Sequence, residues 1–333
     1  RTMYWPDDAG SVPGSQARRH RTARPPSPSD HRHPLNETST SMRDGLIAGL
    51  VAYVIWGILP VYFKVVGAAD PLEVLTHRVI WAIPFGAIIL TLRRQWGEVS
   101  RALNHRRMMG WLALSALLIA LNWFAYIWAI HDERIFETSL GYYINPLTNM
   151  LVGVLFFHER LRRMQSLAVG LATTGVMVLV VSGGQVPWIG LFLAVSFTSY
   201  AVIRKKVVIG AMPGLFVETL LLLPFALSWL GWLYASGTST FAAGSTWLNF
   251  WLMMAGPITA LPLLCFTVAA RRLPLTLIGF MQFLAPTLQF CTGIYFGEQL
   301  TSAHIVCFGF IWLAVIVFSF DIARSGRRVP VTA

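Results

Sequence analysis

Long apolar runs with too few charges to fold in water are the feature that most constrains this chain. One such run, from Thr138 to Leu161, is followed about 140 residues later by a diverged copy that begins at Thr276. Each copy is about twenty residues long, enough at 1.5 Å per residue to cross a hydrocarbon core of roughly 30 Å. We therefore predict that both copies are transmembrane segments of a duplicated chain.

The composition of the 333-residue chain is typical of a membrane protein. Apolar residues make up 55% of the chain and charged residues 12%, against about 25% charged in a typical soluble domain. The formal net charge of +11 would suggest a nucleic-acid partner if the basic side chains formed one patch, but they lie in short clusters between apolar runs. We expect a lipid bilayer as the environment and no nucleic-acid partner.

Ten predicted spans define an all-α integral membrane protein. Residues 1–44 predict a disordered cytoplasmic tail, and residues 321–333 predict a second cytoplasmic tail. With the N-terminus inside, 23 Lys and Arg residues fall on the cytoplasmic side and only Lys64 and Arg134 fall outside, which predicts that both termini are cytoplasmic. The spans cover residues 45–66, 72–93, 109–130, 136–157, 164–182, 187–206, 211–234, 246–269, 274–297 and 302–320.

The duplication divides the spans into two five-helix repeats, 45–182 and 187–320. The run Lys64-Val-Val after the first span recurs as Lys206-Val-Val after the sixth. Because five is an odd number, the second repeat enters the membrane with the opposite polarity to the first. Inverted repeats of this kind are typical of secondary transporters whose site lies near the midplane, between the halves.

Ionisable side chains fall inside the predicted spans. His77 and Arg78 lie about two turns from the outer end of the second span, and Glu218 about two turns from the inner end of the seventh. An ion at such depth costs from a few to more than ten kcal/mol, so it normally faces a cavity or a partner. We predict that Arg78 holds an anionic substrate group and that Glu218 binds a cationic group or a coupling proton. The alternative for both is a side chain that reaches a headgroup surface.

Uncharged polar and aromatic side chains form a second group of candidates. Tyr142, Asn145 and Asn149 recur at spacings of three and four residues, so they share one helix face. Such a face beside aromatic rings suits a small polar or amphipathic solute, and interhelical hydrogen bonding is the alternative. The predicted substrate-binding residues are His77, Arg78, Asn122, Trp123, Tyr126, Tyr142, Asn145, Asn149, Glu218, Gln282 and Gln289.

Two prolines occupy matching places in the two repeats. Pro146 and Pro286 each lie in the middle of a predicted span, where a proline removes one helical N–H and frees a carbonyl. We predict that they are hinges, and static kinks are the alternative. Motifs of nucleotide, zinc and hydrolase sites are missing from the sequence. We therefore expect no enzyme activity, no cofactor and no metal site.

Several runs between residues 45 and 320 carry a family resemblance: AYVIWGILPVYFK, LEVLTHRVIWAIP, NWFAYIWAI, SLGYYINPL, FFHERL and GPITALPLLCFTVAARRL. Through them the chain resembles the RarD-type permeases of the EamA group, in the drug/metabolite transporter superfamily. The resemblance implies a ten-helix exporter of small solutes in the inner membrane of a bacterial cell. The chain differs from the family pattern in its long, basic, proline-rich N-terminal region.

Together these features predict a secondary transporter that works by alternating access. Its partners would be a small-molecule substrate and the lipid bilayer, with a proton as the candidate coupling ion. The alternative function is a membrane sensor or scaffold that moves no solute. The sequence carries no prediction of substrate identity or oligomeric state.

Overall fold

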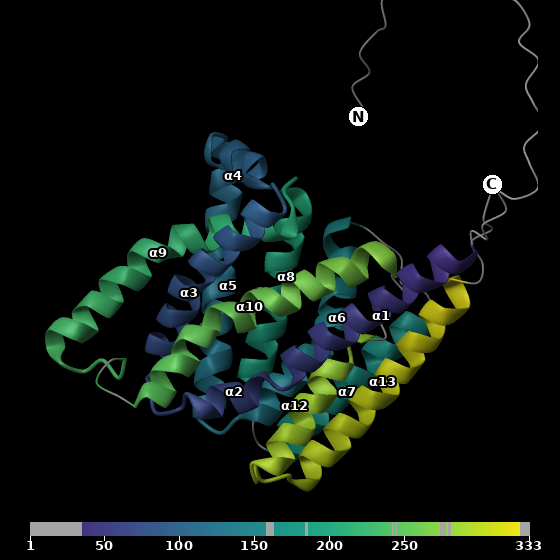
Figure 1. Ribbon diagram of the computed structural model, residues 1–333. Helices are drawn as coiled ribbons and strands as arrows, with labels where there is room; N and C mark the ends of the chain where they lie inside the picture. Colours follow the sequence, from purple (N-terminus) through teal and green to yellow (C-terminus); the bar gives the residue numbers. More distant parts are fainter. Residues whose placement is uncertain are drawn as a thin grey trace, which may run out of the picture. The chain divides into compact units, whose positions relative to one another are not determined.

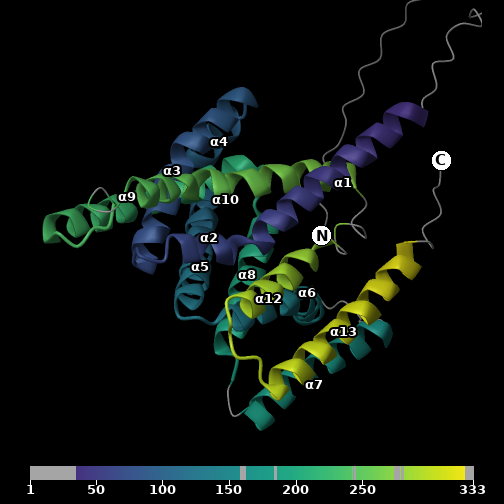
Figure 2. The same cartoon turned by 60° about the horizontal axis from the view of Figure 1, so that its bottom comes forward.

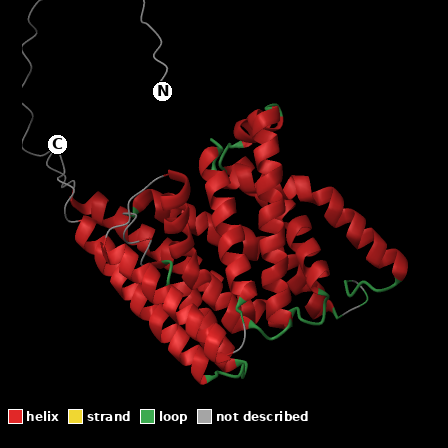
Figure 3. Ribbon diagram, turned by 180° about the vertical axis from the view of Figure 1, so that it is seen from behind, coloured by secondary structure: helices red, strands yellow, loops and turns green. Residues whose placement is uncertain are grey.

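The fold is all-helical in the computed structural model, which describes residues 35–157, 163–183, 186–241, 243, 245–273, 278 and 281–326. Within these ranges no strand occurs (Figure 3). The predicted all-α fold class is therefore confirmed. The helices, labelled in Figure 1, are α1 (Leu35–Gly57), α2 (Leu59–Val65), α3 (Pro71–Leu92), α4 (Trp96–Leu103), α5 (Arg106–His131), α6 (Ile135–Phe157), α7 (Arg163–Gly183), α8 (Trp188–Lys206), α9 (Ala211–Ser236), α10 (Thr246–Arg272), α12 (Leu284–Tyr295) and α13 (Ser302–Gly326).

Several of these helices can cross a membrane. In the described part of the chain, α3, α5, α7, α9, α10 and α13 contain segments that are long and apolar enough, which makes 6 candidate spans. A seventh span arises if α1 and α2, which meet at a bend of 43°, are counted together. The chain is thus a multi-pass membrane protein, and the count of ten spans stays a prediction.

The first predicted span, 45–66, is two helices rather than one. Pro60 lies in the first turn of α2, and a proline lacks the N–H that would continue the ladder while its ring clashes with the carbonyl four residues earlier. That carbonyl belongs to Trp56, and α1 accordingly ends at Gly57. The freed Trp56 carbonyl accepts a hydrogen bond from Gln289 Nε2 at 3.1 Å. A residue of α12 thus stabilises the break.

The ninth predicted span, 274–297, is also interrupted. Turn residues at Gln282 and Phe283 precede α12, and Pro286 lies in the first turn of that helix. A proline there costs little because the first N–H groups of a helix have no intrahelical partner. The matching Pro146 and its neighbour Asn149 lie in α6, but their side chains are outside the described residues.

Helices of the two predicted repeats pack against each other. In Figures 1 and 2, α7 lies along α13. Helix α3 packs on both α9 and α10, and α6 packs on both α8 and α12. The α6–α8 crossing is close because glycine faces glycine: a Cβ on Gly141 would lie 2.8 Å from the carbonyl oxygen of Gly190. Small residues permit such close approach of helices in a membrane.

The described ends of the chain are helical. Helix α1 begins at Leu35, ahead of the predicted start at residue 45, and α13 continues to Gly326, past the predicted end at 320. Residues 1–34 and 327–333, which make up most of the two predicted tails, lie outside the described residues. The helix α4 was not predicted; it buries Val99 and Ala102 while most of its other side chains are exposed.

Candidate functional site

Arg78 lies in α3, about two turns after the helix begins. Asp70 caps that beginning by accepting a hydrogen bond from the Leu72 amide at 2.8 Å, and Pro71 occupies the first turn, where its missing N–H costs nothing. The Arg78 side chain is only 8% exposed. It therefore stays inside the helix bundle instead of reaching a headgroup surface.

Aromatic side chains from three other helices lie around the Arg78 guanidinium. Its Cζ lies 4.1 Å from the ring centroid of Trp123 on α5 and 6.0 Å from that of Phe63 on α2. Tyr126 on α5 makes edge contacts with Phe63 and with Tyr142 on α6, at centroid distances of 5.8 and 5.6 Å. We call these five residues the Arg78 box. A desolvated cation–π contact of this kind contributes about 2 kcal/mol.

The Arg78 guanidinium has no acidic partner among the residues that the structure describes. Its Nε is buried without a hydrogen-bond partner. Burying an ion costs several kcal/mol, more than one cation–π contact returns. The Arg78 box thus lacks a compensating negative charge.

His77 contacts a different part of the protein. Its ring lies on Phe241, in the α9–α10 connection, at a centroid distance of 4.6 Å. Glu73, one turn earlier on α3, binds the same connection by accepting hydrogen bonds from Ser239 Oγ at 2.8 Å and the Thr240 amide at 2.9 Å. The structure therefore separates His77 from the Arg78 box. Glu73 was not among the predicted site residues, although an acidic residue inside an apolar run was a signal.

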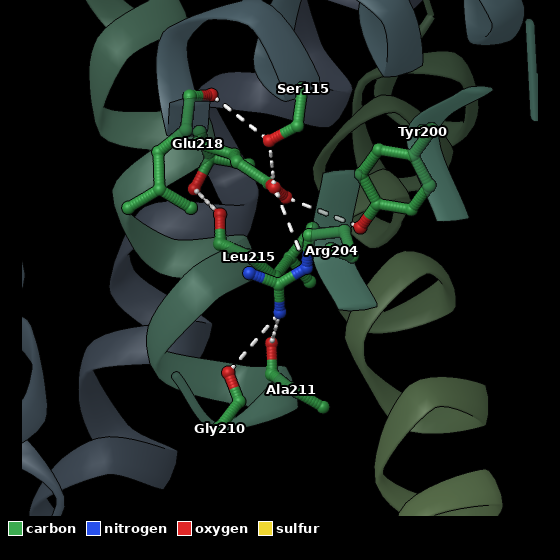
Figure 4. Close-up of polar contacts among 9 residues, drawn as sticks. Ser115, Tyr200, Arg204, Gly210, Ala211, Leu215 and Glu218 are labelled. Carbon is green, nitrogen blue, oxygen red and sulfur yellow. Dashed lines mark hydrogen bonds and ion pairs between the residues drawn. The ribbon is translucent and has the colours of Figure 1, made fainter. Parts of the chain in front are cut away.

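Glu218 belongs to a separate, buried polar cluster (Figure 4). Its carboxylate accepts hydrogen bonds from Ser115 Oγ at 2.5 Å and Tyr200 Oη at 3.3 Å. Arg204 Nε lies 3.6 Å from the same carboxylate, and another nitrogen of that guanidinium donates to the Gly210 carbonyl at 3.2 Å. This Glu218 cluster joins α5, α8 and α9. Arg204 falls at the end of the predicted span 187–206 and was not among the predicted site residues, so its contact with Glu218 was not predicted.

The Arg78 box and the Glu218 cluster lie at different levels of the bundle. Both use α5, through Trp123 in the box and Ser115 in the cluster. At 1.5 Å per residue, these two positions are about 12 Å apart along the helix axis. Arg78 and Glu218 therefore do not share one contact network.

Comparisons with known proteins assign the chain to a family. The pattern of the EamA-like transporter family matches residues 43–181. An uncharacterized transporter of Pseudomonas aeruginosa is 47% identical over 88% of this chain and 98% of its own length. The RarD protein of Salmonella typhimurium is 45% identical over 86% and 98% of the two chains, and that of Escherichia coli 42% identical over 86% and 97%. The chain belongs to the RarD branch of the EamA-like transporter family.

A solved structure supports the fold of this RarD-type protein. A protein crystal structure aligns with a TM-score of 0.55 over 84% of this chain and 98% of the other, at 16% identity. At that identity the likeness concerns the fold alone. Family membership places the chain in the drug/metabolite transporter superfamily, so its partners include a small-molecule substrate and the lipid bilayer.

Two of the predicted substrate-binding side chains of this RarD-type chain form hydrogen bonds between helices. Asn122 Nδ2 donates to the Leu193 carbonyl at 3.0 Å and to Ser196 Oγ at 2.9 Å, between α5 and α8. Gln289 binds the Trp56 carbonyl, as described above. These contacts support interhelical hydrogen bonding, the alternative interpretation, for both residues.

Unlike Asn122 and Gln289, the predicted residues Asn145 and Gln282 are not placed by a hydrogen bond between helices that the structure records. Asn145 is buried, its Oδ1 has no hydrogen-bond partner in the described chain, and it lies one turn after Tyr142 on the same face of α6. It therefore extends the polar lining of the α6 face beside the Arg78 box. Gln282 is half-buried in the turn before α12.

A cavity of about 730 Å³ lies near the α12–α13 connection, away from the Arg78 box. Glu298 lines it and accepts hydrogen bonds from the backbone amides of Ile135 and Phe136 at the start of α6, the second at 2.8 Å. Burial raises the pKa of the Glu298 carboxyl, an effect that the two amides and Lys64 partly oppose. Neither the cavity nor this contact was predicted from the sequence.

Proposed function

We propose that this protein is a secondary transporter that exports a small solute from the bacterial cytoplasm by alternating access. The observation that carries the proposal is the Arg78 box, a buried cation surrounded by aromatic rings and without an acidic partner among the described residues, in a member of a transporter family. A charge held in this way lowers stability, so its presence is best explained by a ligand that enters the bundle.

In this proposal, alternating access arises from the movement of two inverted repeats that together contain ten spans. A two-fold axis in the membrane plane, passing between the repeats, brings equivalent helices together. The pairs α3 and α9, α6 and α12, and α7 and α13 are equivalent under the predicted duplication, and each pair is in contact. In this proposal the repeats rock about these contacts, and Pro146 and Pro286 act as hinges.

Glu218 is the proposed site of a coupling proton. Protonation would neutralise the carboxylate that lies 3.6 Å from Arg204 Nε and so weaken the link between α8 and α9. Because Ser115 and Tyr200 donate to the same carboxylate, the change would also reach α5. Loss of these contacts would let the end of the bundle at the Glu218 cluster open. Both termini are proposed to face the cytoplasm, with the protein in the inner membrane.

Transport is tested before any substrate is assumed. Solutes inside and outside cells with and without the protein are compared, and the solutes that differ are followed in vesicles that contain the purified protein. We expect Arg78→Ala and Glu218→Gln to abolish flux while the protein remains in the membrane. Arg272→Gln, which changes an exposed ion pair with Asp44, is the matched control with normal flux.

Three outcomes would contradict the proposal or one part of it. Normal flux in both variants would remove Arg78 and Glu218 from the transport site. Reconstituted protein that moves no solute, together with altered signalling when the protein is deleted, would favour a sensor or scaffold. Flux that does not respond to an imposed pH gradient would show that transport is not coupled to a proton. Facilitated exchange of the solute would then be the mechanism.

A further inference from the structure

The electrostatics of the Arg78 box indicate what it can bind. Its single cation is more than nine-tenths buried, and no carboxylate in the described part of the chain forms an ion pair with it. The nearby acid on its own helix, Glu73, is occupied by the α9–α10 connection. Glu218 is occupied by Arg204. The compensating negative charge must therefore come from outside the described protein.

We propose that the Arg78 box binds a small organic monoanion, a carboxylate whose remaining part is flat and apolar. This inference rests on the proposed function and names its substrate class. A guanidinium presents parallel N–H groups that match the two oxygens of a carboxylate, and Nε of Arg78 is free to donate. The rings of Phe63, Tyr126 and Tyr142, which contact one another in the Arg78 box, would pack against the rest of the molecule.

The count of positive charges selects a monoanion over a dianion. Arg78 brings one charge, and the other described cations near the ends of the bundle are engaged: Lys64 with Glu133, Arg134 with Glu137, and Arg204 with Glu218. A phosphate ester with two charges would leave one of them buried without compensation, which is costly at low dielectric. A carboxylate carries one negative charge, which the single positive charge of Arg78 compensates.

Binding by three probes of similar size tests the proposal. The full-length protein in lipid nanodiscs is titrated calorimetrically with phenylacetate, its neutral analogue phenylacetamide, and the dianion phenyl phosphate at pH 8. We expect phenylacetate to bind at least about tenfold more tightly than the other two, the factor that one charge-assisted contact supplies. Arg78→Gln should lose that preference, Arg78→Lys should keep part of it, and Arg272→Gln should keep all of it.

Thermal unfolding without ligand gives an independent test. Because the buried cation of Arg78 has no acidic partner in the part of the chain that the structure describes, Arg78→Met should raise the midpoint of unfolding and lose the stabilisation by phenylacetate. A lower midpoint would mean that the cation is already compensated within the protein, and it would overturn the proposal. This measurement also shows that the variant is folded.

Other outcomes separate this inference from the proposed function. Equal binding of phenylacetate and phenylacetamide, tight binding of phenyl phosphate, or no binding of phenylacetate to the unaltered protein would overturn the inference. Flux of a neutral solute that survives Arg78→Gln would also overturn it while leaving transport in place. Arg78-dependent binding of phenylacetate without flux of any solute would support the site and overturn the proposed function.

Discussion

At the scale of single residues, two buried charges of this chain have different surroundings. Glu218 is compensated by Arg204 and by two hydroxyl donors, whereas Arg78 has aromatic neighbours and no carboxylate in the described chain. A buried ion pair contributes little net stability, but removal of one partner leaves the other charge uncompensated. The two clusters should therefore respond differently to mutation.

Neutralising Glu218 alone should destabilise the protein. Glu218→Gln leaves the largely buried Arg204 without its counter-charge, and we expect a loss of roughly 3 kcal/mol in the free energy of unfolding. The double variant Glu218→Gln with Arg204→Met should recover part of that loss, because no unpaired charge remains. Urea-induced unfolding in detergent is measured for the two single variants, Glu218→Gln and Arg204→Met, and for the double variant. Losses that simply add would show that the two side chains are not energetically coupled.

At the scale of elements, each contact between helices depends on a particular residue type. Gly141 permits the α6–α8 crossing because any Cβ there would press on the backbone of Gly190. Glu298 ties the α12–α13 connection to the start of α6, where free amides and the helix dipole attract a carboxylate. These contacts join segments that are far apart in the sequence.

Gly141→Ala should separate α6 from α8. The added methyl group would lie 2.8 Å from the Gly190 carbonyl oxygen, so we expect a loss of about 1–3 kcal/mol in stability. Gly170→Ala in α7 is the matched control, since its Cβ would meet nothing within 4 Å. That control should gain up to about 1 kcal/mol from helix propensity. Equal midpoints of thermal unfolding for the two variants would argue against a close α6–α8 crossing.

The pH dependence of stability tests the Glu298 contact. Because the pKa of Glu298 is raised in the folded protein, the folded state holds this proton more tightly than the unfolded state at pH values between the two pKa values. Its stability should therefore increase, relative to Glu298→Gln, as pH falls from 7 towards 5. The midpoint of thermal unfolding of both proteins is measured across that range. His304, which lines the same cavity, is present in both and cancels in the difference.

The opposite trend for Glu298 would be equally informative. A difference that shrinks as pH falls would mean that the ionised carboxylate is the stabilising form, with the amides of Ile135 and Phe136 outweighing the cost of burial.

At the scale of the whole molecule, the proposed inverted repeat fixes on which face of the membrane equivalent connections lie. The connection after α3 and the connection after α9 follow equivalent helices, so inverted repeats require them to lie on opposite faces of the membrane. Gly97 and Ala243 are exposed positions in or near these connections.

Cysteine labelling tests that demand. In a chain whose 3 native cysteines are replaced by alanine, Gly97→Cys and Ala243→Cys are introduced one at a time. An impermeant thiol reagent added to intact cells should label the cysteine at position 243 only, and should reach position 97 only after the membrane is opened. The parent without cysteines controls for background. Equal labelling of both positions in intact cells would contradict the inverted arrangement.

The apolar runs alone were enough to predict an all-helical membrane protein and to single out Arg78. A run of about twenty apolar residues has few alternatives to a spanning helix, and a charge within it is conspicuous. The same local logic explains the bend at Pro60, because the clash of a proline ring depends only on the residue four positions earlier.

The partners of the buried polar groups were decided only by the tertiary structure. Glu298 lies more than a hundred residues from the α6 amides that it binds, and Ser115 is equally remote from Glu218. Which side chains meet depends on how helices cross and rotate, and a helix crossing is the sum of many small contacts spread along both helices. Periodicity fixes the face of a helix, but the neighbour opposite that face is set by the packing of the whole bundle.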